Sequence, residues 1–176
     1  MIINRVWAMP NKWTFTIPPI NKLLKCYVDK GIGWTDPYCG ENSPAEYRND
    51  LDKDNKYAHT HHDALFFLKN LPSNSYNGVL LDPPYSLRQV SEHYKKAGIK
   101  ITSWHTSAGY NSTLKNEASR ILEIGGLAIC FGWNSMGLGI NRGFEMLEVL
   151  LVPHGGSKND TIVTVEIKKS HQEQLI

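Results

Sequence analysis

Short apolar runs alternate with amphipathic stretches along this chain, and this alternation restricts the folds that it can adopt. Apolar residues recur at helical spacing in segments 20–28, 64–71 and 114–122. Extended segments are predicted at 34–39, 45–49, 59–62, 79–81, 127–131, 144–152 and 161–167. Strands that alternate with helices form a mostly parallel sheet, whereas the last two strands, joined by a short polar loop, are expected to be antiparallel. The sequence therefore predicts an open α/β sheet with one reversed strand.

Local signals at the ends of these segments add detail. Residues 1–17 are predicted to form an extended arm before the first helix. Asp63 is expected to cap the second helix, because a carboxylate there can accept the free N–H groups of the first turn. The apolar face of that helix is predicted to consist of Leu65, Phe66 and Leu68.

Glycine pairs and a polar tail suggest where other elements end. Asn77-Gly78 is predicted to turn the chain into the strand 79–81, and Gly125-Gly126 to close the third helix. From Lys168 the tail is polar, so we expect it to fray, and Lys168 and Lys169 are interpreted as surface charge.

The composition fits one soluble domain that spans residues 1–176. Hydrophobic residues make up 41% of the 176 positions, charged residues make up 20%, and the formal net charge is only +2. No apolar run approaches the roughly 20 residues that span a bilayer, so no membrane association is expected. The N-terminal segment does not resemble a signal or transit peptide. The three scattered cysteines are typical of a reducing compartment, so a cytoplasmic location is expected.

The segment Asp82-Pro83-Pro84-Tyr85 carries the strongest chemical signal. It follows directly on the apolar strand 79–81, and its two prolines fix the backbone and remove two N–H donors. Asp82 offers a carboxylate at the end of the sheet, and Tyr85 offers a flat aromatic face. An amino group on a planar base could donate to Asp82 and to the Pro83 carbonyl while its ring stacks on Tyr85. The alternative is an ordinary Asp-Pro turn.

Further acids follow the other predicted strands, at Asp36, Asp50 and Asp63. Ligands bind at the carboxyl ends of the strands in such sheets. The positions of these acids therefore favour a binding role for Asp82 over the interpretation as an ordinary turn. They place a candidate binding site at one edge of the sheet.

These residues resemble the S-adenosylmethionine-dependent DNA adenine-N6 methyltransferases. Asp82-Pro83-Pro84-Tyr85 is similar to their catalytic motif, and Asp36-Pro37-Tyr38-Cys39-Gly40 to their Asp-Pro-Phe-Cys-Gly motif. Asp50 matches the acid that binds the ribose hydroxyls of the cofactor, and Asp63 matches the acid that contacts its adenine. The segment 10–17 resembles the part that closes over the methionine end. The likeness covers about residues 10–168 and is greatest to small phage- or prophage-borne members.

The resemblance implies a Rossmann-like class I methyltransferase sheet, S-adenosylmethionine as cofactor and methyl transfer to the N6 amino group of adenine in DNA. It assigns catalysis to Asp82, Pro83, Pro84 and Tyr85. It assigns cofactor binding to Asn11, Lys12, Thr14, Asp36, Pro37, Tyr38, Gly40, Asp50, Leu51, Asp63, Ala64 and Asp82. No metal is implied.

Residues 86–112 are polar, aromatic and irregular, and we expect one or two short helices and a long loop there. Basic and aromatic side chains mixed in this way suit phosphate contacts and a stacking wedge. The candidate nucleic-acid contacts are Arg88, Lys95, Lys96, Lys100, Trp104 and His105. The alternative is a solvated loop with a few structural aromatics. No separate recognition domain is predicted, so specificity would come from this insertion, a homodimer or a partner subunit.

Two other functional classes stay open. A related enzyme could methylate RNA bases or a protein amide, since such enzymes use similar tetrapeptides. A catalytically decayed, nucleic-acid-binding relative is favoured by one departure: Glu41 follows Gly40 where the family usually has a second glycine nearby. The intact series of acids argues against decay. His59 and His61 would share a strand face, but without a nearby cysteine partner no metal site is predicted.

Overall fold

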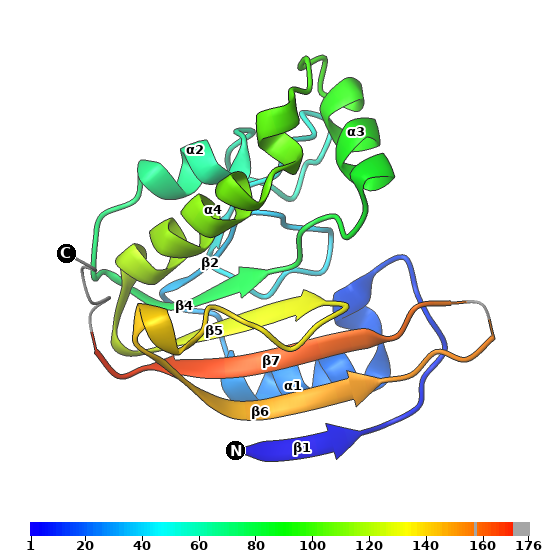
Figure 1. Cartoon of the computed structure of the whole chain (residues 1–176), viewed down its shortest axis with the longest axis vertical. Coiled ribbons are helices and arrows are strands. Elements are labelled where there is room, and N and C mark those ends of the chain that lie inside the picture. Colours follow the sequence, from blue (N-terminus) through cyan, green and yellow to red (C-terminus); the bar gives the residue numbers. More distant parts are fainter. Residues whose placement is uncertain (157, 171–176) are drawn as a thin grey trace.

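The computed structural model describes residues 1–156 and 158–170, and within them one seven-stranded sheet forms the centre of the molecule (Figure 1). The strands are β1 (Ile2–Arg5), β2 (Trp34–Asp36), β3 (Tyr47–Arg48), β4 (Tyr76–Leu81), β5 (Leu122–Gly132), β6 (Phe144–Val152) and β7 (Thr161–Lys168). The helices are α1 (Pro18–Tyr27), α2 (Ala64–Lys69), α3 (Leu87–Lys96) and α4 (Ala108–Ile121), with short 3₁₀ turns η1 (Thr14–Thr16), η2 (Ser103–Thr106) and η3 (Ile140–Arg142). No helix in the described residues has the length and apolar character to cross a bilayer.

The strand order is β1-β6-β7-β5-β4-β2-β3. β7 is antiparallel to both β5 and β6, and the other neighbouring pairs are parallel. The predicted α/β sheet with one reversed strand is thereby confirmed. The insertion between β4 and β5 contains α3, η2 and the start of α4, in keeping with the short helices expected there.

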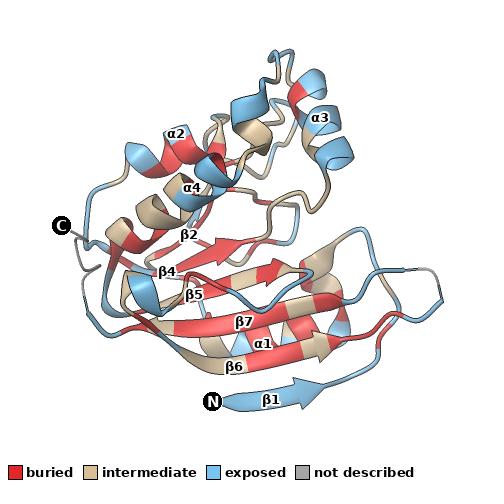
Figure 2. Ribbon diagram, in the orientation of Figure 1, coloured by how far each residue is buried: buried red, intermediate tan, exposed pale blue. Residues whose placement is uncertain are grey.

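Apolar side chains cover both faces of the sheet and make it the middle layer of three. Along β4, Leu80 packs in the cluster that contains α1, whereas Val79 and Leu81 pack in the cluster that contains α2 and α4. This alternation is the period-two geometry of a strand that is buried on both sides. Figure 2 shows the consequence, with the central strands mostly red and the outer face of α3 mostly pale blue.

Two N-terminal and edge predictions need correction. Residues Ile2–Arg5 of the predicted arm form β1, which pairs in parallel with β6 as an edge strand, and Thr14–Thr16 form η1, so the first part of the arm belongs to the sheet. Segment 59–62 forms only an isolated bridge between Thr60 and Asn49. The buried Asn49 side chain explains this, because it accepts the His62 N–H at 2.9 Å and donates to the His62 carbonyl at 2.9 Å. A side chain thus makes the backbone bonds that a neighbouring strand would otherwise make.

The segments Asn77-Gly78 and Gly125-Gly126 lie inside strands, not in turns. Gly78 belongs to β4, and a Cβ built there would lie 2.3 Å from the Trp34 ring. The absence of a side chain at Gly78 therefore lets the Trp34 ring pack directly on the β4 backbone. Gly125-Gly126 lies inside β5, because α4 passes directly into that strand at Leu122.

The apolar face of α2 also differs from the prediction. Phe66 is 54% exposed, whereas Phe67 is 7% exposed and belongs to the core. The helix has only six residues, so the spacing alone allows either phenylalanine to face inward.

Lys168 is buried at 2% exposure, so its assignment to the polar surface tail is wrong. It is the last residue of β7, and its ammonium donates to the carbonyls of Ser119 at 2.7 Å and Leu122 at 2.8 Å. These carbonyls lie at the C-terminal end of α4, where a cation is favourable. Burial lowers the pKa of the Lys168 ammonium.

Replacing Lys168 with methionine is expected to lower the free energy of unfolding by about 2 kcal/mol, because two buried carbonyls lose their donor. Chemical denaturation at neutral pH measures the change. Lys169→Met is the matched control, since its exposed side chain makes only a 3.6 Å ion pair with Glu145. A loss of similar size in both variants would contradict the capping role.

Candidate active site

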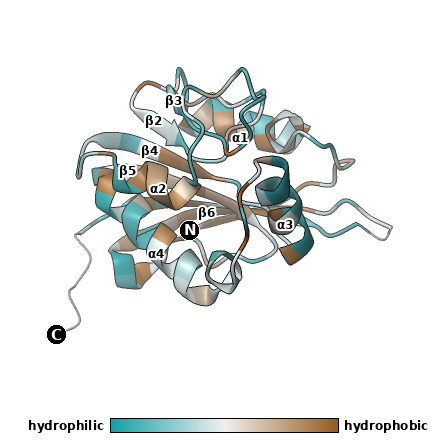
Figure 3. Cartoon of the chain, turned by 90° about the horizontal axis from the view of Figure 1, so that it is seen from above, coloured by the Kyte–Doolittle hydropathy of each residue, from teal (hydrophilic) through white to brown (hydrophobic). Residues whose placement is uncertain are grey.

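A cavity of about 550 Å³ opens at the carboxyl ends of β2, β3 and β4. The strand order reverses here, because the chain runs from β2 to β3 on one side and then crosses to β4 on the other. Open α/β sheets bind ligands at such a reversal. The helix α3 borders the cavity and is largely hydrophilic in colour (Figure 3).

The structure brings most of the predicted site residues together around this cavity. Its lining includes Lys12, Thr14, Pro37, Tyr38, Gly40, Asp50, Leu51, Asp63, Ala64, Asp82, Pro83, Pro84 and Tyr85. Two predicted residues lie elsewhere. Asn11 lines a separate groove of about 980 Å³ beside α1, and Asp36 is fully buried behind the cavity wall.

The segment Asp82–Tyr85 begins where β4 ends and folds back on itself. The Tyr85 hydroxyl donates a hydrogen bond to Asp82 Oδ1. The side-chain oxygen of Gln89 accepts the backbone N–H of Tyr85 at 2.9 Å, and the Tyr85 ring packs against Trp133. Burial raises the pKa of Asp82 to about 6, against the lowering effect of the Tyr85 hydrogen bond. Asp82 is therefore a mostly ionised acceptor at neutral pH.

Asp36 ends β2 and is held entirely by groups of its own loop. One carboxylate oxygen accepts the Tyr38 N–H at 2.9 Å, and the other accepts the Ser43 hydroxyl at 2.6 Å. Burial raises the pKa of Asp36 to about 7, and the negative charges of Asp82 and Asp50 add to this shift. Ser43 comes from the segment after Gly40, where the sequence departs from the family motif, so this segment has a structural role of its own.

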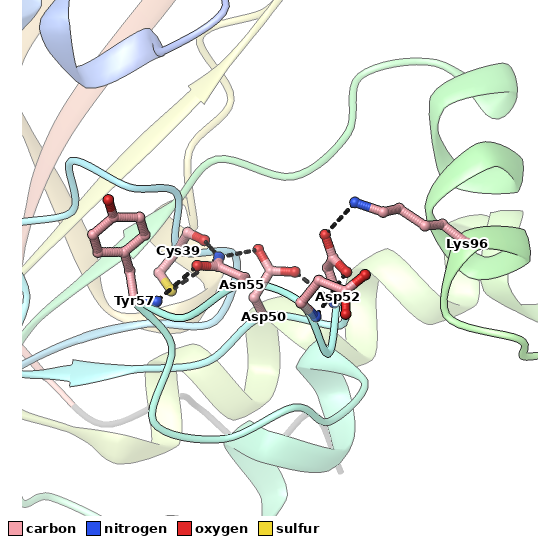
Figure 4. A network of polar contacts seen from close by, with 7 residues as sticks. Cys39, Asp50, Asp52, Asn55, Tyr57 and Lys96 are labelled. Atoms are coloured by element: carbon pink, nitrogen blue, oxygen red, sulfur yellow. Dashed lines mark hydrogen bonds and ion pairs between the residues drawn. The ribbon is translucent and has the colours of Figure 1, made fainter.

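Asp50 stands at the cavity rim in a network of short loop contacts (Figure 4). One of its oxygens accepts the Asp52 N–H at 2.6 Å, and the other accepts the Asn55 amide at 3.1 Å. Asn55 also donates to the Cys39 carbonyl at 2.8 Å, which joins the two loops. Burial raises the pKa of Asp50. A carboxylate has about four acceptor positions, so Asp50 has capacity left for a ligand.

Lys96 reaches from α3 to this acidic loop and meets Asp52 at 2.5 Å (Figure 4). The hydrogen bond from Lys96 lowers the pKa of the Asp52 carboxyl. Lys96 was predicted as a nucleic-acid contact, and in this structure its ammonium is paired within the chain.

The other predicted nucleic-acid residues all lie in the insertion but are engaged differently. Arg88 pairs with Glu92 at 2.7 Å, one turn along α3. His105 bonds to Thr102 and packs on the Tyr94 ring. Exposed positions are occupied by Lys95, Lys100 and Trp104.

Asp63 caps α2 as predicted and also holds the insertion. Its Oδ1 accepts the N–H groups of Leu65 and Phe66 at 3.0 and 3.1 Å. Its Oδ2 accepts the hydroxyls of Tyr94 and, at 2.9 Å, of Tyr110.

Several site residues were not predicted. The sequence interval between Asp63 and Tyr94 is 31 residues, and no local pattern connects them. Ser43 and Asn55, which donate to Asp36 and Asp50, are placed by the folding of their loops, so no local pattern indicates their contacts either. Gln89 did leave a signal, because Ser86 and Gln89 form a capping box that the spacing S-x-x-Q indicates. Among the described residues, no group of three histidine, cysteine or acidic side chains could hold a metal ion.

No protein-family model matches the chain, and no curated protein matches its sequence. Solved structures do match in fold. PH0851 superimposes with a TM-score of 0.53 at 14% identity over 83% of this chain, and TrmN from Thermus thermophilus with 0.53 at 18% over 86%. A protein assigned as a type 11 methyltransferase from Sulfolobus solfataricus gives 0.51 at 15% over 89% of this chain and 95% of its own.

This chain covers 45% of PH0851 and 49% of TrmN, about half of each. At these identities the comparisons establish the fold alone. The chain has the Rossmann-like α/β fold of methyltransferases, with the reversed strand β7 between β5 and β6.

Proposed function

We propose that this chain binds S-adenosylmethionine in the cavity and methylates the N6 amino group of adenine in DNA. One observation carries the proposal. The segment Asp82–Tyr85, which resembles the catalytic motif of the adenine-N6 enzymes, lines the same cavity as Asp50 and Asp63, at the ligand-binding edge of a methyltransferase fold.

The cavity residues fit this cofactor. A volume of about 550 Å³ lies in the usual range for small-molecule sites. Asp50 keeps acceptor capacity suited to a ribose diol, and Pro37 and Leu51 add apolar surface beside it. When bound, S-adenosylmethionine supplies an electrophilic methyl group on its sulfonium sulfur.

Asp82 acts on the nucleophile. The adenine amino nitrogen is a poor nucleophile, because its lone pair is delocalised into the ring. A hydrogen bond from this amine to Asp82, and a second to a neighbouring backbone carbonyl, favours the pyramidal nitrogen in the transition state. Tyr85 offers an aromatic face for the base. A base in a duplex reaches such a pocket only by flipping out of the stack.

The insertion supports a nucleic-acid target. Lys95 and Lys100 are exposed cations of the insertion, and Trp104 is an exposed aromatic in the same segment. Cations serve phosphate contacts, and an aromatic can stack on a base. An aspartate in the first motif position tilts the choice towards bases of nucleic acids.

Incubation with methyl-labelled S-adenosylmethionine and DNA, RNA or protein, followed by nucleoside and amino-acid analysis, tests the proposal. The expected product is N6-methyldeoxyadenosine from DNA. Label in RNA or in protein would reject DNA as the target but would still support methyl transfer as the reaction. Absence of label in all three substrates, with heat-treated protein as the background, would reject the enzyme and favour a decayed scaffold.

A further inference from the structure

The helix α3 is tied to the rim of the cavity at two points. Tyr94 is its only buried residue and donates to Asp63, and Lys96 pairs with Asp52. Both acids line the cavity. Within the described residues, no other side chain of α3 bonds to a group outside the insertion and the motif that precedes it.

The carboxylate of Asp63 has no acceptor position left. It receives two backbone N–H groups of α2 and two tyrosine hydroxyls, and a carboxylate offers about four lone-pair sites. Asp50 differs, because among the described residues only two donors reach its carboxylate. A ligand donor that approaches Asp63 from the cavity therefore has to replace one of its present partners.

Tyr94 is the partner that is easiest to replace. The two N–H groups belong to the first turn of α2, whose helix would lose its cap. Tyr110 is fixed in the core cluster with Leu114 and Ala118. Tyr94 instead sits on a helix whose remaining residues are partly or fully exposed.

We propose that Asp63 is an exchange site, at which a donor of the bound ligand replaces the Tyr94 hydroxyl and so releases the C-terminal end of α3. Tyr94 is a positioning residue that acts through Asp63. The N-terminal end of α3 stays attached, because Gln89 keeps its bonds to Tyr85 and Ser86. Release also frees Lys96 from Asp52, at the position predicted to contact nucleic acid. The identity of the ligand rests on the proposed function.

Amide hydrogen exchange of α3, with and without S-adenosylhomocysteine, tests the exchange in the unmodified protein. A bound ligand usually protects the segments around it. Here we expect the α3 amides to exchange about 3- to 10-fold faster when the ligand is bound, as for the loss of one hydrogen bond. An analogue whose purine lacks the 6-amino group should bind without this acceleration. Protection of α3, or no change, would overturn the inference.

The variant Tyr94→Phe supplies a second readout. It removes the hydroxyl that the ligand must displace, so S-adenosylhomocysteine should bind about 3- to 10-fold more tightly. A merely structural role for Tyr94 predicts weaker binding. The control is Tyr27→Phe, which removes a similar phenol–carboxylate bond, to Glu148 at 2.8 Å, in the separate groove beside α1. Failure of the unmodified protein to bind the ligand would count against the proposed function, whereas binding without these changes would count against this inference alone.

Discussion

Replacing Asp82 with alanine is expected to lower the turnover number by about 100-fold or more, while the affinity for S-adenosylmethionine changes by less than about threefold. In the proposed mechanism Asp82 is the acceptor for the incoming amine, and Asp50, which also lines the cavity, is unchanged in this variant. The effect should therefore fall on the chemical step. Turnover with labelled cofactor, and calorimetric titration of the same variant, separate the two quantities.

Tyr85→Phe is the matched control for this prediction. It removes the hydroxyl that bonds to Asp82 but keeps the ring for stacking, so it should lower turnover by less than about tenfold. The proposed role of Asp82 requires an ionised carboxylate, and burial raises its pKa to about 6, so turnover of the unmodified protein should rise with pH through that value. Near-normal turnover of the alanine variant would remove Asp82 from the mechanism.

Asp36→Asn is expected to stabilise the fold at alkaline pH. Burial raises the pKa of Asp36 to about 7 in the folded chain, above its ordinary unfolded value near 3.9. An acid whose pKa is higher in the folded state stabilises the fold when it is protonated. Its contribution to the unfolding free energy is therefore lost as pH rises from about 4 through about 7. The asparagine amide carries no charge; its oxygen can accept the Tyr38 N–H, and its NH2 group can donate to the Ser43 hydroxyl oxygen in place of the present bond.

The gain in unfolding free energy should therefore be near zero at pH 4 and reach about 2–4 kcal/mol above pH 8. Denaturation at several pH values measures it. Ser43→Ala should instead lower the unfolding free energy at alkaline pH, because the ionised Asp36 carboxylate then lacks the hydroxyl that donates to it at 2.6 Å. A pH-independent difference between Asp36→Asn and the unmodified protein would contradict the buried charge.

Local patterns and long-range contacts differ in how well the sequence reveals them. The alternation of apolar segments predicted the sheet and its reversed strand, and the Asp63 cap could be read from the residues that follow it. Asn49 could not be read in this way, because its side chain replaces a strand partner through contacts 11 to 13 residues away.

The same limit applies to the candidate site. Asp36, Asp50 and Asp82 lie at or just after the ends of parallel strands, and Asp63 follows the bridge at Thr60, so their gathering at one edge follows from the sheet. The hydrogen-bond donors of each carboxylate cannot be predicted in this way. Tyr94 and Tyr110, which donate to Asp63, lie 31 and 47 residues from it in the sequence. Lys168 shows the converse: the polar tail predicts a surface residue, but the Lys168 ammonium is buried and its partners Ser119 and Leu122 lie at the junction of α4 and β5.

Calorimetric titration of the chain with S-adenosylmethionine tests the central claim, that the cavity between β2, β3 and β4 is a cofactor site. We expect one binding site, and binding weaker by about tenfold or more in Asp50→Ala, because this variant lacks the proposed acceptor for the ribose hydroxyls. Lys169→Met, on the exposed surface, should bind as the unmodified chain does. No binding heat at millimolar cofactor, or equal affinity in the Asp50 variant, would contradict the account.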